Sequence, residues 1–273
     1  MKQKQSWKRI SFGFLSFGLV ALAAFITSSC VKTASGRRAL ILVPQGKMLT
    51  LGAQAYREMR TKHRRSRNRR LISIVRKIGL DIARASGVKF QWEFELFDDP
   101  KSVNAFCLPG GKVGVYTGIL PVARTNAGLA AIMGHEVAHA ILRHGAERMS
   151  QQMALNGVMS LGNVVFGNSK YKGAIMGAMG LGAKFGVMLP YSRSHESEAD
   201  RMGLIYMAKA GYNPREAVSL WIRMAQQGKT PLEIVSTHPN PIKRSRALKA
   251  QISSVMKYYN ASRRVRTVRL PLR

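Results

Sequence analysis

The 273-residue sequence contains only two cysteines, Cys30 and Cys107, which are too few for a disulfide-based scaffold. Cys107 stands between Phe106 and Leu108, and these apolar neighbours favour a small buried side chain over a catalytic thiol. If lipidation occupies Cys30, Cys107 is the only thiol left and no intramolecular disulfide can form.

Acidic residues are also scarce. The chain has 13 Asp and Glu against 44 Lys and Arg, which gives a formal net charge of +31. Such a field favours anionic partners: lipid head groups, polyanionic envelope polymers or nucleic acid. A lineage with generally basic proteins would give the same balance, so charge alone assigns no function. The hydrophobic share of 46% is ordinary for a globular protein, and the length suits one or two domains.

Residues 1–29 have the pattern of a bacterial lipoprotein signal peptide. Basic residues at positions 2, 4, 8 and 9 precede an uncharged apolar stretch, residues 10–26. The following TSSC resembles a lipobox, in which cleavage before Cys30 leaves that cysteine to be lipidated, although Thr27 stands where leucine is preferred. Ordinary signal cleavage and an uncleaved anchor helix are the alternatives, and the apolar stretch is short for a membrane span.

The position after the lipobox bears on destination. Val31 and Lys32 follow Cys30, and neither is the aspartate that retains lipoproteins in the inner membrane. We therefore expect a lipid-anchored protein of the cell envelope, on the periplasmic side and at the outer membrane. Residues 30–48 would be a tether, residues 49–258 the folded domain, and residues 259–273 a basic, disordered tail.

Hydrophobic periodicity predicts an α+β fold that is mainly helical. A small, mostly antiparallel sheet should precede a central apolar helix that begins near Asn126 and stops near Gly145. The predicted strands are 90–97, 105–108 and 112–116, and the other predicted helices are 49–59, 71–85, 149–166, 194–210, 214–227 and 241–256.

The central helix carries the motif GHEVAH at positions 134–139. His135 and His139 are one helical turn apart and project from the same face. Two neutral imidazoles supply half of a tetrahedral zinc shell, and the carboxylate of Glu136 can deprotonate a zinc-bound water. A buried helix that contains this short pattern by coincidence is the alternative.

A catalytic zinc ion needs a third protein ligand, and the stretch from His195 to Asp200 offers candidates. Glu196 and Asp200 share a helical face, which favours Glu196 as ligand and Asp200 as acceptor of the second ring N–H of a bound histidine. His195 is the competing ligand. Glu198 lies on the opposite side and is expected to form a structural salt bridge. His144 should point away from the ligand face and be structural.

Together these motifs resemble peptidase family M48, the Ste24/HtpX-type gluzincins, and within it the periplasmic lipoprotein branch of BepA/LoiP type. The resemblance covers roughly residues 49–248. The matching segments, in order, are Asn104-Ala105-Phe106, Leu108-Pro109-Gly110-Gly111, Thr117-Gly118, His135 to His139, Glu196 to Asp200, and Thr237-His238-Pro239 with Arg244.

The resemblance implies a zincin-like metalloprotease domain, here residues 49–258, acting as a zinc endopeptidase on misfolded or unassembled envelope proteins. By matching position, His135, His139 and Glu196 would bind one Zn²⁺ per chain and Glu136 would be the catalytic base. His238 would either stabilise the oxyanion or occupy the fourth zinc position as a latch.

Three further expectations complete the hypothesis. Arg244 is expected to pair with a site carboxylate or with the oxyanion. Residues 112–116 could be the edge strand that aligns an extended substrate. The basic run at residues 60–70 is expected to be solvated, with contact to anionic lipid as the alternative.

Two rival functions stay open at this stage. One is a non-catalytic, chaperone-like lipoprotein that binds unfolded proteins or anionic surfaces, although such a protein has no need of Glu136. The other is a nucleic-acid binder, which charge alone favours. The secretion signal argues against it, and no nucleic-acid-binding motif is visible, so we expect polypeptide and membrane partners and no nucleic acid.

Overall fold

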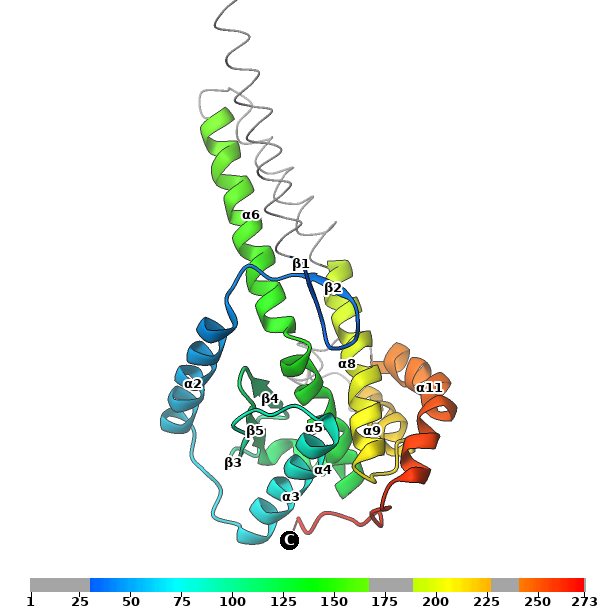
Figure 1. Ribbon diagram of the computed structural model, residues 1–273. Helices are drawn as coiled ribbons and strands as arrows, with labels where there is room; N and C mark the ends of the chain where they lie inside the picture. Colours follow the sequence, from blue (N-terminus) through cyan, green and yellow to red (C-terminus); the bar gives the residue numbers. More distant parts are fainter. Residues whose placement is uncertain (1–29, 167–188, 227–240, 273) are drawn as a thin grey trace, which may run out of the picture.

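The computed structural model describes residues 30–166, 189–226 and 241–272, and it confirms a mainly helical α+β fold (Figure 1). Its elements are β1 (Cys30–Lys32), β2 (Arg38–Leu40), α2 (Gln45–Lys62), α3 (Arg69–Ser86), β3 (Glu93–Phe97), β4 (Ala105–Leu108), β5 (Lys112–Tyr116), the 3-10 helix η1 (Thr117–Ile119), α4 (Leu120–Ala123), α5 (Asn126–Ile141), α6 (His144–Phe166), α8 (Leu189–Lys209), α9 (Arg215–Gln226) and α11 (Pro241–Ala261).

The three-stranded sheet has the order β3-β5-β4. β4 and β5 form the expected antiparallel hairpin through Gly110 and Gly111, both at positive φ, whereas β3 and β5 are parallel. The prediction that residues 112–116 form an edge strand is wrong, because β5 is paired on both sides. The edge strands are β3 and β4.

The two edges of the sheet differ. The outer edge of β3 is covered by the chain between α2 and α3, where Ser66 N–H donates to the Leu96 carbonyl at 2.8 Å and Asp98 N–H to the Arg64 carbonyl at 2.7 Å. Within the described ranges no strand pairs with the outer side of β4. β4 therefore offers its backbone to an incoming extended chain.

Helix α5 is the centre of the domain. Fourteen of its 16 residues are buried, because α3, α8 and α9 surround it together with β4. An almost continuous apolar sequence suits this position, since a helix covered on all sides has no polar face. The two histidines and Glu136 thus lie in the interior, where α8 can reach them.

Two glycines set the crossing of α5 and α8. A Cβ atom on Gly134 would lie 2.9 Å from the Gly203 carbonyl oxygen, and one on Gly203 would lie 2.8 Å from the His135 nitrogen. The helix backbones therefore touch at a point where no larger residue fits. Because Gly134 directly precedes His135, this close crossing brings α8 against the histidine motif.

Both ends of α5 differ from the prediction. Thr125, one residue earlier than expected, caps the helix by accepting a hydrogen bond from Gly128 N–H at 2.9 Å. The helix ends at Ile141 rather than near Gly145, and Arg143 has a φ of 62°. This left-handed residue redirects the chain into α6, which begins at His144 and extends away from the body of the domain (Figure 1).

The N-terminal arm, residues 30–43, is not the free tether that the sequence predicted. Strands β1 and β2 pair in an antiparallel hairpin. Ala39 of β2 and Ile41 and Val43 beyond it are buried, in a small cluster with Met48 of α2 and Ala146 of α6. The arm therefore packs on α2 and on the start of α6.

The C-terminal tail is also ordered where disorder was expected. Leu270 is 7% exposed, and its N–H donates to the Arg124 carbonyl at 2.9 Å. Asn126, the expected helix cap, instead holds this segment: its side chain accepts from Val268 N–H and donates to the Arg266 carbonyl, each at 3.0 Å. The tail is thus hydrogen-bonded to the chain at the N-terminal end of α5.

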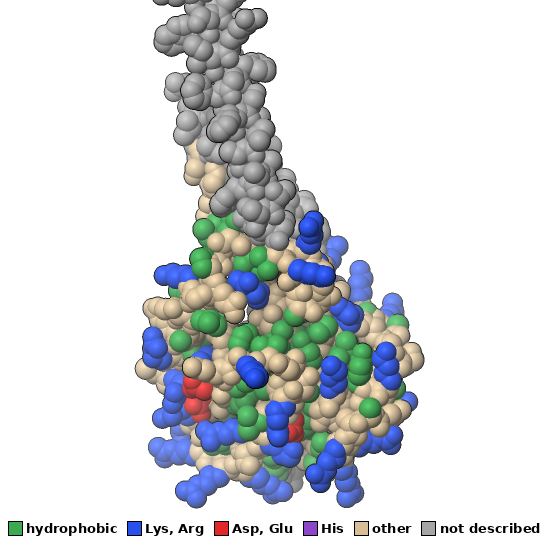
Figure 2. All heavy atoms as spheres, viewed as in Figure 1, with side chains coloured by type: hydrophobic (Ala, Val, Ile, Leu, Met, Phe, Trp, Pro, Cys, Tyr) green, Lys and Arg blue, Asp and Glu red, His purple; other side chains and the backbone are tan. Residues whose placement is uncertain are grey.

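The surface carries the positive charge. Figure 2 shows Lys and Arg side chains spread over the visible face, with few acidic side chains among them. Among the residues that the structure describes, no helix is both long and apolar enough to cross a membrane. Residues 1–29, where the signal peptide was predicted, lie outside the described residues.

Candidate metal centre

His135 and His139 of α5 and Glu196 of α8 converge on one point. Their candidate ligand atoms all lie within 4.8 Å of one another. The two Nε2 atoms are 3.0 Å apart, and the Glu196 carboxylate lies 3.4 Å from each imidazole. In the part of the chain that is described, no other cluster of three His, Cys, Asp or Glu has this property.

The spacing fits a single metal ion. A tetrahedral zinc ion with ligands at about 2.0–2.2 Å holds neighbouring ligand atoms about 3.3–3.6 Å apart, close to the separations observed here. Two imidazoles and one carboxylate are the donor set of several catalytic zinc sites, which leave the fourth position open. The three residues can therefore hold a metal ion without rearrangement of the backbone.

His135 is supported from behind by Asp200 and Arg244. Its Nδ1 lies 3.0 Å from the Asp200 carboxylate, which Arg244 contacts through two nitrogens. Burial would raise the pKa of Asp200, but Arg244 lowers it, so the carboxylate stays ionised. Arg244 also lies 3.1 Å from Glu196 and stacks on Trp221, with its guanidinium carbon 3.5 Å from the ring centroid.

The electrostatics favour positive charge at the centre. Burial and the neighbouring Arg244 would lower the pKa of His135, but hydrogen bonds with Asp200 and Glu196 raise it to about 9. The two carboxylates thus raise the pKa of His135 by more than burial and Arg244 lower it. A metal ion between the imidazoles and Glu196 would supply the same compensating charge.

His139 is supported through a second imidazole. The Nδ1 atoms of His139 and His144 are 2.9 Å apart, and the Nε2 of His144 lies 3.1 Å from the Glu198 carboxylate. Burial and the neighbouring His195 lower the pKa of His144 to about 4, so its ring is neutral at pH 7. A neutral ring can accept from His139 through Nδ1 and donate to Glu198 through Nε2.

The predicted structural residues therefore lie close to the site. His144 was expected to point away, but the break after Ile141 turns it back onto His139. Glu198 forms the expected salt bridge, with Arg37 at 2.8 Å, yet it also holds His144. His195, the competing ligand, instead lies 3.0 Å from Glu147 and is not part of the metal cluster.

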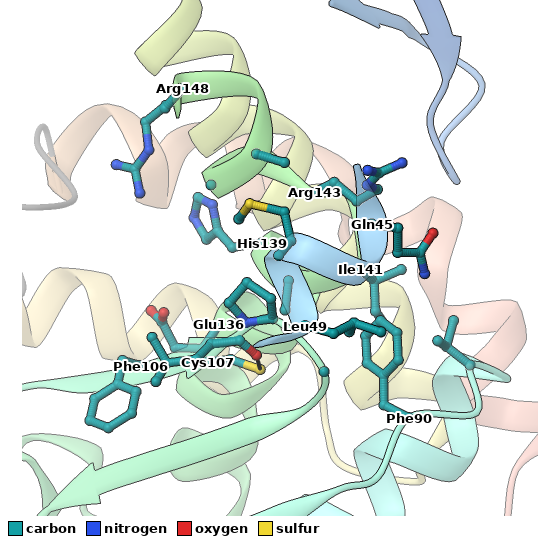
Figure 3. Close-up of a pocket in the computed structure, with 18 of the residues that line it drawn as sticks. Gln45, Leu49, Phe90, Phe106, Cys107, Glu136, His139, Ile141, Arg143 and Arg148 are labelled. Atoms are coloured by element: carbon teal, nitrogen blue, oxygen red, sulfur yellow. Dashed lines mark hydrogen bonds between the residues drawn. The ribbon is translucent and has the colours of Figure 1, made fainter. Parts of the chain in front are cut away.

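Glu136 and His139 border a cavity of about 510 Å³ between α5, β4 and the start of α2 (Figure 3). Its lining is mostly apolar, with two arginines, Arg143 from the turn before α6 and Arg148 from α6 itself. Cys107 of β4 also faces it. Burial raises the pKa of the Cys107 thiol, so this side chain stays protonated at neutral pH, as a non-catalytic cysteine would.

Comparison with known proteins assigns the family. Residues 65–252 match the sequence profile of peptidase family M48. The chain belongs to peptidase family M48. It is 40% identical to the mitochondrial metalloendopeptidase OMA1 of Schizosaccharomyces pombe over 162 residues, which cover 58% of this chain and 46% of that protein.

Other relatives of this M48 chain carry two names. Metalloendopeptidase OMA1 of Bos taurus is 30% identical over 275 residues, covering 93% of this chain and 52% of the relative. The β-barrel assembly-enhancing protease of Escherichia coli is 26% identical over 236 residues, covering 83% and 48%. The chain spans about half the length of these relatives.

Three residues that lie around the metal cluster were missed from the sequence. His144 follows the motif but lies beyond a helix break that periodicity does not predict. Arg37 and Trp221 are far along the chain from the histidines, and no local pattern marks them. His238, predicted to stabilise the oxyanion or to latch the zinc ion, lies outside the described residues.

Proposed function

We propose that the chain is a zinc-dependent endopeptidase in which His135, His139 and Glu196 bind zinc and Glu136 is the catalytic base. The convergence of two imidazoles and a carboxylate at tetrahedral spacing carries this proposal. Membership in peptidase family M48 and relatives that are named metalloendopeptidases support it.

The chemistry follows from the residues around the ion. Bound zinc supplies a Lewis acid that lowers the pKa of water and polarises the scissile carbonyl. Glu136, next to His135 and bordering the cavity, removes the proton from the attacking water and delivers it to the leaving amine. Asp200 accepts the Nδ1–H of His135, which fixes the ring with Nε2 toward the ion.

The peptide would bind along β4 rather than along residues 112–116. Tyr116 N–H donates to the Asn104 carbonyl, so the alternation of antiparallel pairing directs the backbone N–H and carbonyl of Cys107 to the open edge. An extended substrate that pairs with this edge would pass over Glu136 and His139. Backbone pairing does not depend on the side chains of the substrate, which suits a protease that cleaves diverse substrates.

The cavity supports a proposal for the class of substrate. Its apolar lining, including Met48, Leu49 and Phe90, would accept a hydrophobic substrate side chain beside the scissile bond. Folded proteins bury such side chains, whereas misfolded or unassembled ones expose them. We infer that the enzyme acts in quality control of unfolded polypeptides.

Localisation in the cell envelope is part of the same proposal. Lipidation of Cys30 would anchor the chain on the periplasmic side, at the outer membrane, and the basic surface would hold it close to anionic lipid. Salt-dependent binding of the purified protein to anionic liposomes, and none to nucleic acid, is the expected result.

Casein degradation by the zinc-loaded protein tests the activity. Glu136→Gln should lower the rate by about 10²–10⁴-fold, because it removes the base, while zinc content stays unchanged. If the wild-type protein prevents aggregation of unfolded proteins but never cleaves them, the chaperone-like rival is correct. Cleavage by the Glu136→Gln variant at the wild-type rate would refute the mechanism.

A further inference from the structure

The N-terminal arm places one arginine between the two helices that back the metal centre. Arg37 lies between α6 and α8 and contacts Glu147 through two nitrogens, at 2.9 and 2.6 Å. Its Nε donates to Glu198 at 2.8 Å. The arginine side chain is 27% exposed, whereas those of Glu147 and Glu198 are 0% and 8% exposed.

Both buried carboxylates contact this one guanidinium. A buried ionised carboxylate is costly unless charges and hydrogen bonds compensate it, and Arg37 is the cation shared by the two. Glu198 receives two further hydrogen bonds from the hydroxyls of Thr33 and Ser35 on the same arm. The arm therefore holds the Glu198 carboxylate through three of its residues.

Glu198 transmits this constraint to the metal centre. Its carboxylate accepts from Nε2 of His144, which leaves Nδ1 of His144 free to accept from Nδ1–H of His139. This placement of protons directs Nε2 of His139, with its lone pair, toward His135 and Glu196. A turned Glu198 would release His144 and then His139.

We propose that Arg37 is a positioning residue for the zinc ligand His139, acting through Glu198 and His144. The arrangement matches the one behind His135, where Asp200 is held by Arg244. Each zinc-binding imidazole would then depend on a carboxylate that an arginine holds, His135 directly and His139 through His144. One arginine comes from the C-terminal helix α11 and the other from the N-terminal arm, so the arm is part of the metal centre.

The inference rests on the proposed zinc site, and the zinc dissociation constant of the whole chain tests it. Arg37→Gln should weaken zinc binding roughly 10–100-fold, as loss of outer support does at other zinc sites. Arg38→Gln is the matched control, since Arg38 is exposed on the same hairpin and the change in charge is identical. It should bind zinc like the wild type.

Two readouts separate positioning from general damage. The d–d absorption bands of the cobalt-substituted Arg37→Gln protein should shift, because His139 approaches the metal at another angle. Casein cleavage by this variant should recover when zinc is raised above its weakened dissociation constant. Equal affinities and cobalt spectra for Arg37→Gln and Arg38→Gln would overturn the inference.

A second variant covers the case in which Arg37→Gln loses its helical circular dichroism. His144→Phe keeps an aromatic ring of similar size against His195 but removes both hydrogen bonds of the relay. Zinc binding weakened by roughly 10-fold or more supports the relay, and unchanged binding overturns it. A wild-type chain that binds no zinc would instead refute the proposed function.

Discussion

The Asp200 carboxylate lies 3.0 Å from Nδ1 of His135, although 65 positions of the sequence separate the two residues. This contact orients the ring. With Nδ1 donating to Asp200, Nε2 faces His139 and Glu196. The Nε2 proton, which a pKa of about 9 retains at neutral pH, would be released when a metal ion binds.

Asp200→Asn tests this contact. An amide is a weaker acceptor than a carboxylate and can turn its NH₂ toward the ring, so zinc affinity should fall roughly 10–100-fold. Asp81→Asn is the control, because Asp81 is also held by an ion pair, with Lys77 at 2.7 Å, but on α3. Competition with a chromophoric chelator measures both. Equal losses in the two variants would contradict the role of Asp200.

The glycine crossing of α5 and α8 gives a second prediction. Gly203→Ala puts a methyl group 2.8 Å from the His135 nitrogen, so the helices must separate. We expect a loss of about 1–3 kcal/mol in the free energy of unfolding, as in other overpacked cores, and weaker zinc binding. Urea denaturation with and without zinc measures both effects.

Gly157→Ala is the matched control for that variant. Gly157 lies in α6, and a Cβ atom there would meet nothing within 4 Å. Alanine in an open helical position should raise stability by about 0.5–1 kcal/mol. A Gly203→Ala protein as stable as wild type would mean that the two helices can move apart without cost.

The open edge of β4 gives a third prediction. Cys107→Pro removes the backbone N–H that faces the edge, so KM for an unfolded protein substrate should rise several-fold while zinc affinity stays constant. Cys107→Ala keeps that N–H and should leave KM near the wild-type value. If both variants cleave casein with wild-type KM, the substrate does not pair with β4.

Acid stability gives a fourth prediction. Burial would raise the pKa of Glu147, but hydrogen bonds from His195 and Arg37 lower it from 4.5 to about 2. The unfolded chain therefore binds a proton at higher pH than the folded one. The stability that Glu147 contributes is complete above pH 4.5 and is lost as the pH falls from about 4.5 toward 2.

Glu147→Gln should remove this dependence. The variant should be less stable than wild type at pH 7, and its stability should change less between pH 4.5 and pH 2. Glu58→Gln, on the exposed surface of α2, serves as the control and should follow the wild-type curve. Parallel pH profiles for wild type and Glu147→Gln would show that Glu147 is not the titrating group.

What the sequence predicts well is local. The spacing of His135 and His139 in one helix, and of Glu196 and Asp200 in another, is fixed by 3.6 residues per turn, so each pair could be placed on a shared face. The hairpin around Gly110 follows from turn chemistry in the same way. These patterns locate the elements that build the site.

What the sequence does not predict depends on where the chain bends or folds back. His144 was placed by extending one straight helix, but Arg143 breaks it. β5 is paired on both sides because β3, which comes earlier in the chain, lies parallel to it. The alternation of apolar residues within each strand does not reveal this order of strands. Ala39, Ile41 and Val43 do alternate, and that period of two was a sign that the N-terminal arm packs on the domain.

Anomalous scattering at the zinc absorption edge, from crystals of the zinc-loaded protein, tests the central claim most directly. We predict a single peak about 2.0–2.2 Å from Nε2 of His135, Nε2 of His139 and a carboxylate oxygen of Glu196. A zinc-loaded crystal with no peak among these three side chains, or with its peak at another cluster, would contradict the account.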